Sequence, residues 1–258
     1  MEARRTDFVQ SLERGLAVIR AFDADNPRLT LSEVADRVGL TRATARRFLM
    51  TLEQLGYVRT DRRYFMLSPR VLDIGYSYLS ALGLPDVAMP HLERLAADVQ
   101  LSSSVSILEE QDIIYVARVM TKRIMSVNIR VGTRLPAAST SMGRAILAGI
   151  PAEELDQFLE RATLVSYTDA TIVEKPSLRA AIEQVRVLGY AFVDQELELG
   201  LRALAVPLRD ARGRVIAAMN VSVPSGAYSA STVVDSFLEP LQQTARLVER
   251  DFQAVVRT

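Results

Sequence analysis

The chain has 258 residues, of which 49% are hydrophobic and 24% are charged, and its basic and acidic side chains balance at 31 each. This length suits one large domain or two unequal ones, and the apolar fraction is sufficient for packed cores. No uncharged apolar run is long enough to span a membrane, so we expect a cytoplasmic protein with no membrane partner. Cysteine is absent and histidine occurs once, as His91. This excludes disulfides, a cysteine nucleophile and clustered His/Cys metal ligands, and we expect neither a metal nor a cofactor.

The balanced net charge hides an asymmetry along the chain. Residues 1–80 carry 13 basic and 10 acidic side chains, whereas residues 81–258 carry 18 and 21. The basic excess is concentrated in residues 37–70, where eight arginines accompany only two acidic residues. A local excess of this kind favours a nucleic-acid partner for the N-terminal part of the chain.

The N-terminal segment has the pattern of a helix-turn-helix. Apolar residues at helical spacing predict a first helix over roughly 8–23, with a stripe made of Phe8, Leu12, Leu16, Ile19 and Phe22. Thr30 and Glu33 have the spacing of a capping box for a short second helix, and Gly39 is suited to end that helix. Thr41 caps a third helix that extends to about residue 55. The inward positions expected on this third helix are Ala45, Phe48 or Leu49, Leu52 and Leu55.

The outward side of the third helix carries the side chains that would read DNA. In a helix-turn-helix the second of the paired helices enters the major groove, where arginine bonds guanine in a two-pronged manner and threonine contacts a thymine methyl group. Residues 56–67 predict two short strands with a basic tip, a wing that would lie along the phosphate backbone. The predicted DNA contacts are Thr41, Arg42, Thr44, Arg46, Arg47, Arg59, Arg62 and Arg63. The alternative is a three-helix core with a solvated basic surface.

The rest of the chain alternates between helical and strand patterns. Helical spacing over about 69–83 predicts a linker helix, Leu84-Pro85 interrupts it, and another helix follows over about 86–99. Strands are predicted at 104–108, 113–119, 125–129, 192–194, 203–208 and 215–223, and helices at 140–149, 152–162, 176–188 and 230–256. This pattern predicts an α+β fold with a mostly antiparallel sheet. The expected domains are therefore a winged helix-turn-helix over 1–68, a linker helix over 69–83 and a second domain over 84–258.

The order of several short motifs resembles the IclR family of bacterial transcription regulators over essentially the whole chain. At the N-terminus the resemblance depends on Ser11-Leu12-Glu13-Arg14-Gly15-Leu16 and on residues 40–58. In the second domain it depends on residues 131–137, on Ser141-Met142-Gly143-Arg144-Ala145, on residues 189–203 and on Asn220-Val221-Ser222. Residues 127–136 and the Asn220-Val221-Ser222 strand most resemble the PcaR, PcaU and PobR branch, which regulates protocatechuate and 4-hydroxybenzoate catabolism.

This resemblance implies a DNA-binding transcription regulator of catabolic genes with a GAF-like effector domain. It also implies binding to double-stranded promoter DNA, and homodimers that can pair into homotetramers. The effector would be a small organic acid such as protocatechuate, 4-hydroxybenzoate or β-ketoadipate. The implied pocket residues are Ile124, Leu135, Ser141, Met142, Val193, Leu201, Ala203, Asn220 and Ser222. Where other members have two serines on the last pocket strand, this chain has Asn220 and Ser222, which favours a different ligand.

A carboxylate effector needs a cation or converging N–H donors. Arg134 is the predicted partner, with Arg118 and Arg130 as further candidates, and strand alternation places Arg118 on the same side as Val116. The amides that begin the helix near Ser141 are another candidate. The alternative for each arginine is a salt bridge on the surface or at a dimer interface.

Two other classes of protein remain as alternatives. One is an enzyme with a DNA-binding head, but the single histidine and the lack of a nucleophile motif argue against it, and we predict no enzyme and no catalytic residues. The other is a DNA-binding protein whose second domain only mediates oligomerisation or partner docking. In that protein, Met142 and Leu201 would fill the pocket.

Overall fold

The computed structural model describes residues 8–23, 25–75, 83–121 and 129–256, and the chain divides into two compact units, Met1–Tyr78 and Leu79–Thr258. The described part of the chain contains no helix that is long and apolar enough to cross a membrane. The predicted strand at 125–129, apart from the buried Ile129, and residues 76–82 of the predicted linker helix lie outside the described residues. Residues 71–75 of the linker are helical.

The first unit is a winged helix-turn-helix. Its elements in chain order are α1 (Gln10–Arg20), β1 (Leu29–Thr30), α2 (Leu31–Arg37), α3 (Arg42–Gln54), β2 (Val58–Asp61) and β3 (Tyr64–Leu67). The strands form one antiparallel sheet in the order β1-β3-β2, so the wing has a third strand that the sequence pattern did not indicate. A two-residue strand is too short to show an alternating pattern, and only its pairing with β3 identifies it.

Local hydrogen bonds explain where the helices of this unit begin. The Thr30 N–H donates to Glu33 Oε2 at 2.7 Å and the Glu33 N–H donates to Thr30 Oγ1 at 3.4 Å, so the predicted capping box is confirmed. Gly39 has a φ of +63°, the left-handed conformation expected after α2. Thr41 caps α3 by accepting from the Thr44 N–H at 3.2 Å. Together these caps set the tight turn between α2 and α3.

The apolar stripe predicted over residues 8–23 is divided between the core of the unit and its surface. Val18 and Phe22 are buried in the core of the unit with Leu49 and Leu52. Phe8, Leu12 and Leu16, by contrast, are 52%, 62% and 48% exposed. Leu55 was expected to be inward but is 51% exposed, because it lies at the C-cap of α3, past its last inward-facing turn.

The second unit contains a six-stranded antiparallel sheet in the order β6-β5-β4-β9-β8-β7. Its strands are β4 (Ser102–Glu109), β5 (Asp112–Val119), β6 (Arg134–Pro136), β7 (Ala191–Asp194), β8 (Leu201–Arg209) and β9 (Val215–Pro224). Its helices are α5 (Leu84–Val99), η1 (Ala137–Ser139), α6 (Ser141–Leu147), α7 (Ala152–Arg161), α8 (Lys175–Leu188) and α9 (Ala230–Val256). The expected α+β fold is confirmed. However, α5 begins at Leu84 rather than after Pro85, since proline is tolerated in the first helical turn.

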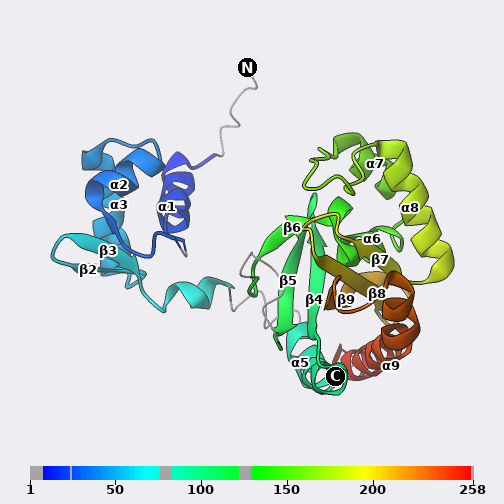
Figure 1. Cartoon of the computed structure of the whole chain (residues 1–258). Helices are drawn as coiled ribbons and strands as arrows, with labels where there is room; N and C mark the ends of the chain where they lie inside the picture. The colour runs from blue at the N-terminus through cyan, green and yellow to red at the C-terminus, as the bar shows by residue number, and fades with distance from the viewer. Residues whose placement is uncertain (1–7, 24, 76–82, 122–128, 257–258) are drawn as a thin grey trace. The chain divides into compact units, whose positions relative to one another are not determined.

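Helices cover both sides of this sheet, with α5 and α9 on one side and α6, α7 and α8 on the other (Figure 1). The side under α5 and α9 carries large apolar residues, among them Leu204, Val206, Met219 and Val221. The side under α6 carries smaller or polar residues at the alternate positions, among them Ala205, Ala218, Ser104, Asn220 and Ser222. Because the side chains on the α6 side are smaller, they fill less of the space between the sheet and the helices that cover it.

Close contact between α6 and the η1 turn requires a glycine at position 143. A Cβ added there would lie 2.1 Å from the Ala137 carbonyl oxygen and 2.4 Å from its Cα. We expect Gly143→Ala to destabilise the protein by ~1–3 kcal/mol, because the backbone of η1 must move to accept the methyl group. Denaturant unfolding of the full chain measures this.

Gly226→Ala is the matched control, since a Cβ at position 226 has no heavy atom within 4 Å. It should change the free energy of unfolding by less than ~0.5 kcal/mol. Equal stability of the two variants would contradict the proposed close contact.

Candidate functional site

The exposed side of α3 carries the arginines singled out from the sequence. Arg42, Arg46 and Arg47 are exposed, whereas Ala45, Leu49 and Leu52 on the opposite side are buried. Thr41 and Thr44 share a hydrogen bond of 2.9 Å between their hydroxyls at the start of the helix. The unit therefore presents an unbroken basic surface at the N-terminal half of α3, which is the part of a recognition helix that contacts base edges.

The wing adds further positive charge. Arg59, Arg62 and Arg63 are exposed, and Arg62 at the tip has a φ of +51°, a left-handed conformation that glycine adopts more readily than arginine. The Arg28 and Arg63 guanidinium carbons lie 4.7 and 5.9 Å from the centre of the Tyr64 ring. The stacking at Tyr64 restricts both arginines, and it adds Arg28, which the sequence pattern did not single out, to the basic wing.

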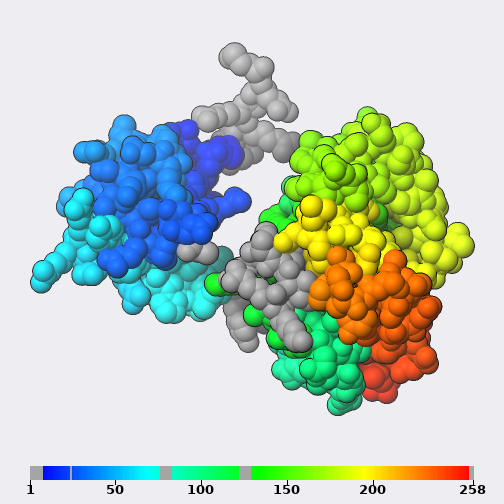
Figure 2. All heavy atoms as spheres, in the orientation of Figure 1, coloured from blue at the N-terminus to red at the C-terminus, as the bar shows by residue number. Residues whose placement is uncertain are grey.

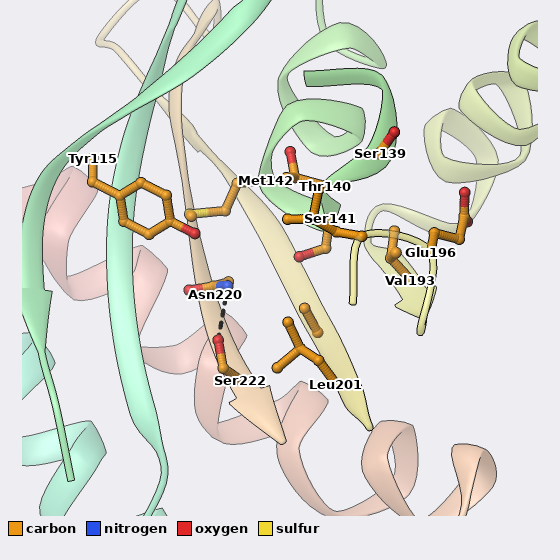
Figure 3. A pocket seen from close by; sticks show the side chains of 12 residues that line it. Tyr115, Ser139, Thr140, Ser141, Met142, Val193, Glu196, Leu201, Asn220 and Ser222 are labelled. Atoms are coloured by element: carbon orange, nitrogen blue, oxygen red, sulfur yellow. Dashed lines mark hydrogen bonds between the residues drawn. The ribbon is translucent and has the colours of Figure 1, made fainter. Parts of the chain in front are cut away.

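A cavity lies in the second unit between the start of α6, the polar side of the sheet and the segment after β7. Its empty volume is about 390 Å³. Its lining residues are Tyr115, Ser139, Thr140, Ser141, Met142, Val193, Glu196, Leu197, Leu201, Ala203, Asn220 and Ser222 (Figure 3). The mixture of apolar walls with few polar groups is typical of small-molecule sites. Met142 and Leu201 are both part of the lining.

The structure brings most of the sequence-predicted pocket residues together. The seven that line the cavity are Ser141, Met142, Val193, Leu201, Ala203, Asn220 and Ser222. Ile124 lies outside the described residues. Leu135 packs against the apolar cluster under α6 and is not part of the lining. The lining also includes Tyr115, Ser139, Thr140, Glu196 and Leu197, which the sequence analysis did not assign to the pocket.

Arg134 does not line the cavity. It forms a surface ion pair, which the sequence analysis gave as the alternative to binding the effector. Its Nε donates to Asp112 Oδ2 at 3.0 Å and its Nη2 donates to the Glu109 carbonyl at 3.3 Å. Its side chain is 42% exposed. Because Arg134 is on β6 at the sheet edge and pairs opposite Ile114, it binds the end of the β4–β5 hairpin instead of the cavity.

Two hydrogen-bonding groups in the lining are buried and have no partner among the described residues. These are Ser141 Oγ and Asn220 Oδ1, on residues that are 1% and 3% exposed. The Asn220 amide nitrogen makes only a long contact of 3.5 Å to Ser222 Oγ. In Figure 3 the Ser141 hydroxyl and the Asn220 amide extend toward the same space from opposite walls. Since leaving a buried polar group unpaired costs ~1–3 kcal/mol, these atoms indicate a ligand that supplies the missing hydrogen bonds.

A β-bulge changes which side of the sheet Arg118 occupies. The β4–β5 pairing shifts between Val105 and Ser106, so that Ser106 lies opposite Tyr115 and Ser104 lies opposite Arg118. Val116 and Ala117 both join the cluster under α5 and α9. The expectation from strict alternation that Arg118 shares a side with Val116 is therefore wrong. The extra residue returns Arg118 to the side of Tyr115 and the cavity.

Tyr115 lines the cavity on β5, and Arg118, which is not among the lining residues, lies beside it. The Arg118 Nη1 donates to Ser104 Oγ at 3.0 Å, and its guanidinium carbon lies 5.8 Å from the centre of the Tyr115 ring. Burial raises the pKa of the Tyr115 hydroxyl to about 12, so it remains a protonated donor at neutral pH. Burial also lowers the pKa of Arg118 from its usual range, and the nearby Tyr115 partly opposes this change.

A buried ion pair holds the outer wall of the cavity. The Arg144 guanidinium on α6 donates to the two Glu196 carboxylate oxygens at 2.6 and 2.5 Å, and its Nε donates to the Ala138 carbonyl at 2.9 Å. The Ile172 N–H also donates to Glu196 Oε2 at 3.1 Å. Figure 3 shows that the Glu196 carboxylate points away from the cavity, so this acid is a structural partner and not a free charge in the pocket.

The segment after β7 that carries Glu196 is at the surface of the second unit. Figure 2 shows this segment, in yellow, between the light-green helical region and the orange β9–α9 region. Leu199 is 72% exposed there, whereas Glu196 is 7% exposed. The buried Glu196 side chain therefore holds this segment in place, and the segment is exposed to solvent at Leu199.

His91 lies on the other side of the sheet. Its Nε2 is 2.9 Å from Asp251 Oδ2, which links α5 to α9, and it is not part of the cavity lining. Among the described residues no group of His, Cys, Asp and Glu side chains could hold a metal ion.

Comparisons with known proteins identify the family. The model described as the IclR helix-turn-helix domain matches residues 11–62, and the model described as the bacterial transcriptional regulator IclR C-terminal domain matches residues 76–250. The chain belongs to the IclR family. The family resemblance and the two-part α+β fold expected from the sequence are confirmed.

Two of the proteins similar to this IclR-family chain are named for the pca regulon and for p-hydroxybenzoate hydroxylase. The Pca regulon regulatory protein of Pseudomonas putida is 44% identical over 241 residues, which cover 93% of this chain and 83% of that protein. The p-hydroxybenzoate hydroxylase transcriptional activator of Acinetobacter baylyi is 36% identical over 249 residues, which cover 95% of this chain and 92% of that protein. A solved IclR homolog from Microbacterium hydrocarbonoxydans, complexed with 4-hydroxybenzoate, has a TM-score of 0.84 and 27% identity, and covers 95% of this chain and 99% of that one.

These findings establish the general function. The chain is a ligand-responsive, DNA-binding transcription regulator of the IclR family, and its relatives are named regulators, not enzymes.

The buried ion pair yields a stability prediction. Glu196→Gln removes one charge and leaves the buried Arg144 guanidinium without its partner, so we expect a loss of ~3–5 kcal/mol in the free energy of unfolding. The double variant Arg144→Met/Glu196→Met should lose less than the sum of the two single variants, because neither charge then remains unpaired. Denaturant unfolding of the wild type, Glu196→Gln, the single variants Arg144→Met and Glu196→Met, and the double variant measures both effects.

The exposed ion pair between Arg179 and Asp156 is the matched control, with side chains 40% and 61% exposed. Asp156→Asn should change stability by less than ~1 kcal/mol. If Glu196→Gln is no more damaging than Asp156→Asn, the ion pair does not hold the wall of the cavity.

Proposed function

We propose that this protein controls catabolic genes by binding a small organic acid in the cavity under α6. The observation that carries the proposal is the pair of buried, unpartnered groups, Ser141 Oγ and Asn220 Oδ1, on opposite walls of an otherwise mostly apolar space. Asn220 Oδ1 only accepts hydrogen bonds, so a ligand must bring a donor to it. A phenolic hydroxyl supplies this donor, and the aromatic ring suits walls formed by Met142, Val193 and Leu201.

The effector class is a small organic acid, such as 4-hydroxybenzoate, protocatechuate or β-ketoadipate. Support comes from the relatives named for the pca regulon and for p-hydroxybenzoate hydroxylase, and from the homolog complexed with 4-hydroxybenzoate. Asn220 and Ser222 are both on β9 and make this wall of the pocket polar. The Asn220 amide would select among such acids by the hydrogen bonds that each acid can form with it. The residues proposed to bind the effector are Ser141, Met142, Val193, Leu201, Ala203, Asn220 and Ser222.

The winged unit is proposed to read promoter DNA with the exposed end of α3. Arg42, Arg46 and Arg47 would lie in the major groove with Thr44, while Thr41 and the wing arginines Arg59, Arg62 and Arg63 would bind phosphates. The support is that these arginines are exposed together on one basic surface and that caps at Thr30 and Thr41 set the angle of the two helices.

A second copy of the chain is proposed to cover α1. Leu12 and Leu16 are four residues apart on α1, Phe8 lies just before the helix begins, and all three are exposed. Exposed apolar stripes of this kind mark protein interfaces. A homodimer would present two recognition helices to a repeated site, and an effector that binds one arrangement of the dimer better would shift promoter affinity by a coupling of ~1–3 kcal/mol.

The DNA-binding proposal predicts different effects for two arginines. Arg46→Ala should weaken binding to a selected promoter duplex by ~1–3 kcal/mol and leave binding to random duplex nearly unchanged, because a base contact is lost. Arg62→Ala should weaken binding to both duplexes similarly, since a phosphate contact carries no sequence information. Fluorescence anisotropy at one fixed salt concentration measures the four affinities.

Arg212→Ala removes an exposed arginine from the β8–β9 turn of the other unit and is expected to change neither affinity. An Arg46→Ala loss of equal size on promoter and random DNA would show that Arg46 contacts only phosphate.

The effector proposal predicts selective stabilisation of the full chain. A thermal-shift screen would use 4-hydroxybenzoate, protocatechuate, β-ketoadipate, muconate, pyruvate and glyoxylate. An effector at 100 times its dissociation constant should stabilise the protein by ~2.7 kcal/mol. Ala203→Leu, which places extra volume in the cavity, should remove the shift, while Ala211→Leu on an exposed turn should retain it.

No saturable shift with any of these acids would contradict the proposed effector class. A shift that survives in Ala203→Leu would place the ligand outside this cavity.

A further inference from the structure

The arginines near the cavity differ in whether they already have an acidic partner. Arg144 is bound through both terminal nitrogens to Glu196, and Arg202 pairs with Asp194 at 2.8 Å. Arg134 pairs with Asp112 at 3.0 Å. Each of these guanidinium groups is neutralised by the protein itself, so none is free for the charge of a ligand.

Arg118 has no such partner in the part of the chain that the structure describes. Its contacts among the described residues are one hydrogen bond of 3.0 Å from Nη1 to Ser104 Oγ and the approach of 5.8 Å to the Tyr115 ring. Its Nε is buried and makes no hydrogen bond. Residues 122–128, which follow β5 and are not described, contain no Asp or Glu. A partly buried guanidinium without a counter-charge is costly, and a bound anion would remove that cost.

Arg118 is on the same side of the sheet as the cavity. Through Ser104, its guanidinium lies over β4, which is between β5 and β9 in the sheet. Tyr115 on β5 and Asn220 on β9, opposite Ser104, both line the cavity. The guanidinium is therefore on the cavity side of the sheet, beside the lining residue Tyr115, although Arg118 is not itself one of the lining residues. Its one side-chain hydrogen bond is to Ser104.

We infer that Arg118 is the residue that receives the carboxylate of the effector in this cavity, an inference that rests on the proposed effector function. The competing partner is the start of α6, where backbone N–H groups also point toward this space. That helix has seven residues, and the Gly143 N–H is already bound to Thr140 Oγ1 at 3.2 Å. A full, unpaired charge with an unused N–H attracts a carboxylate more strongly than the partial charge of two helical turns.

The test compares an acid with its neutral amide in the full-length protein. The probes are 4-hydroxybenzoate and 4-hydroxybenzamide, which have nearly the same shape but differ in charge, and calorimetry gives both dissociation constants. The wild type should bind the acid more tightly than the amide. In Arg118→Gln, affinity for the acid should fall by roughly 10–150-fold while affinity for the amide changes by less than about threefold.

Two further variants make the result interpretable. Arg134→Gln removes an arginine that is paired on the surface, and it should leave the acid-to-amide ratio unchanged. Arg118→Lys retains the charge but loses the two-pronged geometry, so the ratio should fall by less than in Arg118→Gln. Arg118→Lys also provides a folded variant for the comparison if Arg118→Gln melts at a much lower temperature.

The failure of this inference differs from the failure of the proposed function. If the wild type binds the acid and the Arg118 variants retain its acid-to-amide ratio, the carboxylate is bound elsewhere, at the start of α6, and the effector function stands. If the wild type binds neither this acid nor any other acid of the thermal-shift panel, the proposed function itself is overturned. If another acid of the panel binds instead, that acid and its amide replace the probes, and the same comparison of ratios decides the role of Arg118.

Discussion

The second unit depends on the buried ion pair between Arg144 and Glu196. Arg144 extends from α6 and binds both the η1 turn, through the Ala138 carbonyl, and the segment after β7, through Glu196. Glu196 in turn accepts from the Ile172 N–H before α8. Three stretches that are distant in the sequence are thereby joined at one pair of charges. Because a buried charge without its partner is far less stable, this pair favours one arrangement of the wall, and the cavity has a defined shape before any ligand binds.

The cavity exists because the two sides of the sheet carry side chains of different size. Under α5 and α9 the alternate positions are filled by Leu204, Val206, Met219 and Val221, and the packing there is continuous. On the α6 side the same strands present alanine, serine and asparagine. These side chains are small, although Ser106 on β4 still reaches α6, where its hydroxyl donates to Met142 Sδ at 3.3 Å. The lining of the space that remains includes two groups whose hydrogen bonds the described residues do not complete.

The polar groups in and beside the cavity are of two kinds, those already paired within the protein and those without a hydrogen-bond partner among the described residues. Glu196 and Arg144 satisfy each other and contribute no net charge to the cavity. Ser141 Oγ, Asn220 Oδ1 and the Nε of Arg118 remain without hydrogen-bond partners among the described residues. A ligand that completes these hydrogen bonds gains binding free energy. When the ligand binds one state better than another, that difference shifts the equilibrium between states with different promoter affinity.

The local elements were predictable from the sequence because their signals are local. The capping box at Thr30 and Glu33, the left-handed Gly39 and the alternating strands each depend on residues within a few positions of one another. The family motifs predicted seven of the residues that line the cavity. The roles of the arginines were not predictable in the same way. Arg134 finds Asp112 across a strand pair, and the bulge opposite Val105 and Ser106 moves Arg118 to the cavity side. The sequence by itself therefore determined the elements, the family and most of the pocket lining. Only the tertiary structure decided which charges are neutralised and which one is left for a ligand, since ion pairs and strand register join residues that are far apart in the chain.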